Sequence, residues 1–209
     1  MPHSAYHGDD DLEFEEYLGE YASVSSIVRE ALPFEIIATI GGVIAGIIFT
    51  GMTKELDLIP GLIVITPAVL GMRGNISCTL GSRLGTAIHM GLITRIDNNP
   101  ELINNVSGSL LLSFILSIVL GVLGHYVTIA LGLDSAGILV LTLIAVIAGV
   151  TSGIMLSIVA VLLALGMFRF GFDPDNVVTP AIATIGDIVS MFMLMIAAKV
   201  VLALWPIIL

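Results

Sequence analysis

The sequence predicts an all-α polytopic membrane protein with five transmembrane helices. Hydrophobic residues make up 57% of the 209 residues and charged residues only 11%, and the mean hydropathy is +1.09. These values lie outside the range of soluble globular domains. A helix needs about 20 apolar residues to cross a bilayer, and the sequence contains five stretches of suitable length if one interruption is allowed. The predicted location is the cell membrane, with several crossings.

The N-terminal residues 1–31 are predicted to form an acidic cytoplasmic tail, and residues 32–209 the membrane domain. Nine of the 17 acidic residues fall within the first 35 positions, so the net charge of −10 belongs largely to the tail. Apolar residues between Leu12 and Val28 recur at helical spacing, which predicts a short amphipathic helix. The acidic balance excludes a nucleic-acid-binding surface, and the single cysteine, Cys78, excludes an intrachain disulfide.

The first two membrane helices are predicted at residues 34–53 and 58–93. Pro33 precedes the first one and suits the first turn of a helix. A short polar turn, Lys54 to Asp57, separates the two. The second helix is predicted to be interrupted between Arg73 and Thr79, where small and polar residues replace the apolar run. It counts as one crossing because the charged residues of its second half disfavour a separate span.

The other three membrane helices are predicted at residues 106–131, 136–167 and 177–204. Loops at 95–105 and 169–176 join the second helix to the third and the fourth helix to the fifth. Five crossings place the termini on opposite sides of the membrane. Arginines are more numerous in the segments on the N-terminal side, so the positive-inside rule predicts a cytoplasmic N-terminus and an outside C-terminus.

Glycines recur four residues apart in three of these helices. Small residues at this spacing let helix backbones approach closely in membranes. The pairs predict a compact bundle, and they are Gly42 with Gly46, Gly81 with Gly85, and Gly149 with Gly153.

An acidic residue, Asp187, lies in the middle of the last apolar stretch, whose only other formal charge is Lys199. A carboxylate at the centre of a bilayer costs about 2.5–3.5 kcal/mol. Such a group is retained where it meets an opposite charge, a water-filled cavity or a cation. Helical spacing places small and hydroxyl-bearing residues on the same face. That face carries Asn176, Thr179, Pro180, Ala183, Thr184, Ser190 and Met191.

This face offers oxygen ligands. Pro180 removes one helix hydrogen bond and so frees a carbonyl group. Carboxylate, hydroxyl and carbonyl oxygens suit hard cations such as Mg²⁺ and Ca²⁺. Because each chain supplies one carboxylate, a Mg²⁺ ion held through its waters fits better than a dehydrated ion. Two interpretations remain open: Asp187 belongs to a cation site, or it forms a buried ion pair with Arg73, the candidate charge partner.

Two classes of enzyme are disfavoured by the sequence. There is no phosphate-binding loop, which argues against ATP-driven pumping by this chain alone. Intramembrane aspartyl proteases need a glycine where Thr184 stands, and a second membrane aspartate. We therefore expect no enzymatic activity, and the alternative to a transporter is a non-transporting membrane subunit of a larger complex.

Two segments resemble the MgtE and solute carrier family 41 magnesium transporters. Residues 67–87, which contain PAVLGMRGN and TLGSRLGTA, resemble the second membrane helix of that family, and residues 171–187 resemble the fifth. The resemblance implies a dimer with a cation pore between the protomers, lined by these two helices, and it puts the ion-binding aspartate at Asp187. It also implies pore-lining positions at Gly71, Asn75, Thr179, Ala183 and Gly186.

The predicted metal site, from the resemblance and the face of Asp187 together, is Asp187, Thr179 and Ala183. The other predicted pore-lining residues are Gly71, Gly74, Asn75, Asn176, Pro180, Gly186 and Ser190.

The function implied is divalent cation transport, with Mg²⁺ as the expected ion and the membrane potential as the driving force. A Na⁺- or H⁺-coupled Mg²⁺ exchanger is the alternative. Bacterial relatives carry large cytoplasmic sensing domains, which the 209 residues do not contain. The expected partners are therefore a second copy of the chain, the lipid bilayer and a separate cytoplasmic regulatory subunit.

Overall fold

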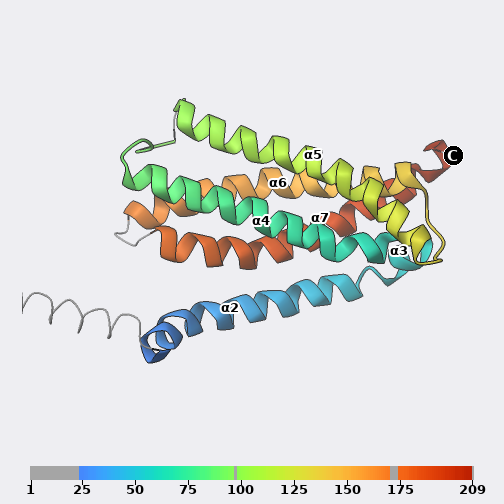
Figure 1. Cartoon of the computed structure of the whole chain (residues 1–209), viewed down its shortest axis with the longest axis horizontal. Coiled ribbons are helices and arrows are strands. Elements are labelled where there is room, and N and C mark those ends of the chain that lie inside the picture. The colour runs from blue at the N-terminus through green and yellow to red at the C-terminus, as the bar shows by residue number, and fades with distance from the viewer. Residues whose placement is uncertain (1–23, 97, 170–173, 209) are drawn as a thin grey trace, which may run out of the picture. The chain divides into compact units, whose positions relative to one another are not determined.

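The structure, a computed structural model, describes residues 24–96, 98–169 and 174–208 (Figure 1). Most of the predicted acidic tail and its amphipathic helix lie outside these residues. All regular elements of the described residues are helices, which confirms the all-α prediction. The chain divides into two compact units, Met1–Ile37 and Ala38–Leu209, and the boundary falls within α2 (Val24–Thr50).

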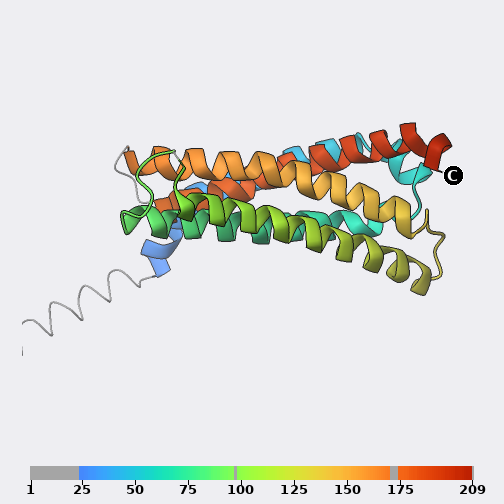
Figure 2. The ribbon, with the colours of Figure 1, turned by 90° about the horizontal axis from the view of Figure 1, so that it is seen from above.

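The second unit contains four long helices in an antiparallel bundle (Figures 1 and 2). They are α4 (Leu62–His89), α5 (Pro100–Ala130), α6 (Ile138–Arg169) and α7 (Pro174–Ile208). Helix α4 packs against the other three, and α6 packs against both α5 and α7. Each of these four helices contains a segment long and apolar enough to cross a membrane.

The first predicted crossing, residues 34–53, corresponds to α2. Its apolar described segment, Glu35–Thr50, is shorter than the length usually needed for a span. Four helices thus have the length and composition of membrane spans, in agreement with a multi-pass protein, and the crossing by α2 stays a prediction.

Three predicted boundaries were wrong for local reasons. Helix α4 is continuous from Leu62 to His89, because isolated glycines and polar residues are tolerated in a helix packed on three sides. The polar turn after α2 is a short helix, α3 (Thr53–Leu58). Helix α5 begins at Pro100 rather than near residue 106, because the side chain of Asn99 accepts hydrogen bonds from the amides of Glu101 and Leu102.

Two of the three glycine pairs lie at close helix contacts. A Cβ atom on Gly149 would collide with Ser117 of α5, and one on Gly153 would collide with Arg73 of α4. A Cβ atom on Gly81 would lie 2.7 Å from Ile182 of α7. The predicted role in helix packing is confirmed at these positions.

The outward face of α5 is apolar along most of its length, as expected of a surface that meets lipid tails. Only 17% of the apolar segment of α5 is buried inside the bundle. The exposed side chains include Leu111, Leu112, Phe114, Ile115, Leu116, Ile118, Val119, Leu123, Val127 and Ile129.

Candidate functional site

Asp187 lines a cavity of about 460 Å³ between α2, α4 and α7. Every lining residue belongs to the second unit, so the cavity lies within one compact body. Its wall is otherwise apolar or small, and it consists of Gly42, Ala45, Gly46 and Phe49 of α2, Ile63, Thr66, Pro67 and Leu70 of α4, and Asp187 and Met191 of α7.

The carboxylate of Asp187 has no hydrogen-bond or ion-pair partner among the described residues. The side chain is partly exposed toward the cavity. The described part of the chain contains no group of three or more His, Cys, Asp or Glu side chains that could chelate a metal ion. One copy of the chain therefore offers a single anionic ligand here, which suits an ion that keeps part of its water shell.

Pro67 leaves one backbone carbonyl of the α4 wall without its usual helix hydrogen bond. A proline has no amide hydrogen, so the carbonyl of Ile63, four residues earlier, cannot receive the usual helix hydrogen bond. Both residues line the cavity. The neighbouring hydroxyl of Thr66 donates to the carbonyl of Leu62 at 2.8 Å and so remains available as an acceptor. The residues that carry this carboxylate, carbonyl and hydroxyl, Asp187, Ile63 and Thr66, thus line the same cavity.

Two glycines of α2 keep this space open. A Cβ atom built on Gly42 or Gly46 would meet no atom within 4 Å. Within the described chain Gly42 and Gly46 make no close helix contact, so their role in helix packing stays a prediction, and both line the cavity opposite Asp187.

The other predicted residues of α7 are distributed around the helix. Thr179, Pro180 and Ala183 are partly buried, and the thiol of Cys78 in α4 donates to the carbonyl of Thr179 at 3.7 Å. Gly186 is buried and faces Leu156 of α6, so it lies away from the cavity of Asp187.

Ser190 and Asn176 are the two remaining predicted positions of α7. Ser190 is buried, and its hydroxyl is without a partner among the described residues. The side chain of Asn176 lies outside the described residues.

The predicted pore-lining residues of α4 do not join Asp187 in the cavity. Gly71 is exposed and Gly74 is partly buried, and neither has an atom within 4 Å of a Cβ position. Asn75 is exposed and lines two cavities between α4 and α5. The structure therefore brings Asp187 together with Pro67 and Leu70, about two turns and one turn before Asn75.

Arg73 has other partners than Asp187. Its side chain is only 1% exposed, and its terminal nitrogens donate to the carbonyl of Gly149 at 2.6 Å and the hydroxyl of Ser113 at 2.7 Å. Those partners belong to α6 and α5. The interpretation in which Arg73 neutralises Asp187 is not supported, and Arg73 instead joins three helices of the bundle.

The residues that sequence reasoning missed in this cavity belong mainly to α2. Ala45, Phe49 and Ile63 carry no chemical signal in the sequence, and only the bundle geometry brings them to Asp187. Two signals were present: the open pair Gly42 and Gly46, and Pro67 in an apolar helix.

Comparison with known proteins points to a class of transporter. The sequence pattern of the family described as MgtE, divalent cation transporter, matches residues 66–197. This segment covers most of α4, all of α5 and α6, and α7 beyond Asp187.

Similar curated proteins come from vertebrates. The chain is 29% identical over 184 residues to solute carrier family 41 member 2 of Xenopus laevis, covering 83% of this chain and 32% of that protein. It is 29% identical over 199 residues to the human member 2, covering 90% and 34%. It is 30% identical over 139 residues to member 3 of Rattus norvegicus, covering 64% and 29%. The chain thus spans about a third of the length of these relatives.

Proposed function

Since the chain belongs to the MgtE family of divalent cation transporters, we propose that it carries Mg²⁺ across the membrane along the cavity of Asp187. The observation that supports this most is the position of Asp187. An unpaired carboxylate faces an open cavity of about 460 Å³ inside a bundle of apolar helices. A charge so placed is favourable only if water or a cation accompanies it.

The proposed pathway needs a second copy of the chain. One carboxylate compensates only half of the charge of a divalent cation, and two copies bring two. The α4 surface next to the cavity also differs from the lipid-facing side of α5. It exposes Pro67 and Gly71, where α5 exposes large aliphatic side chains. Small residues suit a surface that meets another helix, which supports a pore at a homodimer interface.

The direction of transport follows from electrostatics. We propose that α2 also crosses the membrane, which gives five crossings with the N-terminus in the cytoplasm. An inside-negative membrane potential contributes about 2.3 kcal/mol per charge per 100 mV to cation entry. Mg²⁺ can then enter passively, channel-like and without ATP. A regulatory subunit in the cytoplasm would supply the gate.

Flux measurements on purified protein test this function. In proteoliposomes with an imposed inside-negative potential, we expect Mg²⁺ uptake that scales with the potential and needs no Na⁺ or H⁺ gradient. Uptake that appears only with an opposing Na⁺ or H⁺ gradient would instead establish the coupled exchanger. A folded, reconstituted protein that gives no uptake under either condition would favour the non-transporting subunit.

Filling the cavity from the opposite wall is expected to reduce uptake. Leucine at position 46 has room for its Cβ, so Gly46→Leu should leave the melting temperature nearly unchanged while its side chain occupies the space facing Asp187. Gly46→Ala is the matched control and should retain most of the flux. Equal flux in Gly46→Leu and the wild type would show that ions do not pass this cavity.

A further inference from the structure

A second hollow region lies on the other side of α4, along its contact with α5. It consists of two adjoining cavities of about 280 and 540 Å³ that share Asn75 and Ile76. Most residues that line the smaller cavity have polar side chains, and most of those that line the larger one are aliphatic. One continuous crevice thus changes from polar to apolar along its length.

The smaller, polar cavity lies toward the end of the bundle where α4 ends and α5 begins. Arg83 is the only charged residue that lines it among the described residues. Amide and hydroxyl groups provide further donors around it. The polar side chains of this lining are Asn75, Thr79, Arg83, Asn104, Asn105 and Ser109.

The guanidinium of Arg83 is held in a fixed orientation. Its Nε atom donates to the side-chain carbonyl of the buried Asn105 at 2.6 Å. Asn105 is anchored in turn, because its amide donates to the backbone carbonyl and to the carboxylate of Glu101, both at 2.8 Å. The arrangement leaves the two terminal nitrogens of Arg83 as charged donors, a geometry that suits the oxygens of a phosphate group.

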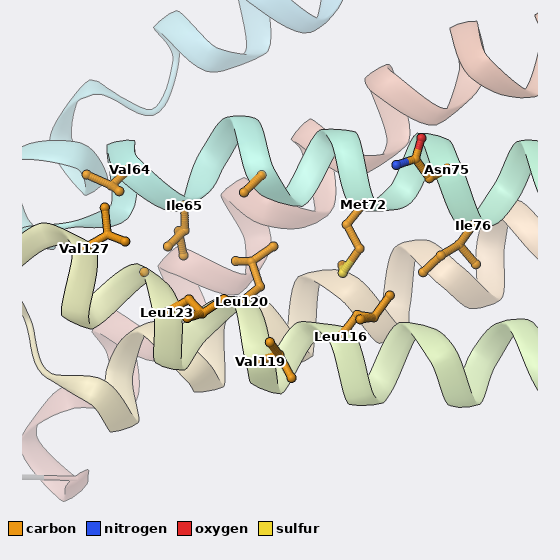
Figure 3. Close-up of a pocket in the computed structure, with 12 residues that line it drawn as sticks. Val64, Ile65, Met72, Asn75, Ile76, Leu116, Val119, Leu120, Leu123 and Val127 are labelled. Atoms are coloured by element: carbon orange, nitrogen blue, oxygen red, sulfur yellow. The ribbon is translucent and has the colours of Figure 1, made fainter.

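The larger cavity is an apolar groove between α4 and α5. Figure 3 shows Ile65, Met72 and Ile76 of α4 above Leu116 and Leu120 of α5, with Asn75 and Ile76 at one end of the groove. Leu116, Val119, Leu123 and Val127 line it from α5 and are also part of the exposed apolar face of that helix. The groove therefore opens onto the surface that meets lipid tails.

We propose that this crevice binds an anionic phospholipid, with its phosphate at Arg83 and one acyl chain in the groove along α4 and α5. Arg83 lies within two turns of the end of α4, and Asn105 lies within two turns of the start of α5, so the charged end of the crevice is near the helix ends, where a lipid headgroup would lie. The apolar groove extends from it toward the middle of the bundle, as an acyl chain would. Basic pockets between membrane helices are a recurrent site for anionic headgroups.

A lipid fits the crevice better than a second copy of the chain. The groove is bordered by large aliphatic side chains of α5, whereas close helix contacts in membranes favour small residues. A free phosphate ion would account for Arg83 but would leave the apolar groove unexplained.

Native mass spectrometry of the detergent-purified protein tests the site, and it needs no transport activity. Added phosphatidylglycerol should be retained in preference to phosphatidylcholine, and Arg83→Gln should weaken phosphatidylglycerol binding about fivefold, as expected for the loss of one basic residue at an anionic headgroup. Arg95→Gln removes the same charge from the loop at the same end of the bundle and should have little effect. Arg83→Lys should keep most of the preference, because it keeps the charge.

The apolar part of the site is tested separately. Val119→Trp places a large side chain in the groove from an exposed position and should lower retention of both lipids. The proposal fails if Arg83→Gln and Arg95→Gln lose lipid equally, or if both lipids bind the wild type equally. It also fails if Val119→Trp changes only the fraction of dimer, since a second copy of the chain would then occupy the crevice. Loss of Mg²⁺ flux in Asp187 variants bears on none of these outcomes.

Discussion

Replacing Asp187 by alanine is expected to abolish measurable Mg²⁺ uptake while the bundle stays folded. The carboxylate is the one anionic group in its cavity. A divalent cation held about 5 Å away through a water molecule gains about 2 kcal/mol from this charge at the dielectric constant of water, and about 7 kcal/mol at an effective constant of 20. Even the smaller gain corresponds to more than tenfold in occupancy, so uptake by Asp187→Ala should fall at least about tenfold.

The melting temperature distinguishes a lost site from a lost fold. Asp187 makes no hydrogen bond or ion pair with the described residues, and its removal relieves the cost of a charge in an apolar surround. Asp187→Ala should therefore melt at or above the wild-type temperature. Asp134→Ala removes the same charge from the exposed turn between α5 and α6 and should leave both flux and melting unchanged. Wild-type flux in Asp187→Ala would remove the residue from the pathway.

Replacing Arg73 by alanine should, unlike Asp187→Ala, lower the stability of the bundle strongly. Arg73 is one of the largest fully buried side chains, and Gly153 lies so close that the structure has no room for a Cβ atom there. Arg73→Ala would leave a cavity between α4, α5 and α6 and remove the hydrogen bonds to Ser113 and Gly149. We expect a cost of about 2–4 kcal/mol, seen as a lower melting temperature in detergent.

Arg73→Met is the matched variant for this prediction. Methionine fills most of the same space without a charge, and apolar replacements of buried charged groups are often tolerated. It should melt close to the wild type and retain Mg²⁺ flux. If Arg73→Met loses flux and the double variant with Asp187→Leu regains it, then the two residues act as an ion pair after all.

The helices of the bundle could be predicted from the sequence because long apolar runs can hardly form anything else in a bilayer. Asp187 could be singled out for the same reason, since a carboxylate in such a run is costly. The continuity of α4 was harder to foresee. Gly71 and Gly74 weaken a helix in isolation, and their tolerance depends on contacts of α4 with α5, α6 and α7.

The residues that share the cavity with Asp187 could not be derived from its own helix. Helical spacing gave Ser190 a place near it and the family resemblance gave Gly186 one, but α6 covers Gly186. The opposite wall comes from α2 and α4, and sequence spacing contains no information on how these helices cross α7. Arg73 illustrates the same limit, because only the packing of Gly149 and Ser113 shows that it faces away from Asp187.

Thiol labelling at position 187 tests the central claim most directly, namely that Asp187 lies on a water-filled cation pathway. The chain contains one cysteine, so Asp187→Cys in a Cys78→Ser background presents a single thiol. We expect a membrane-impermeant, positively charged thiol reagent to modify this cysteine in reconstituted protein, and Mg²⁺ to slow the reaction. Leu111→Cys, on the lipid-facing side of α5, is the control that should stay unmodified. If Asp187→Cys is as unreactive as Leu111→Cys, the pathway does not pass Asp187.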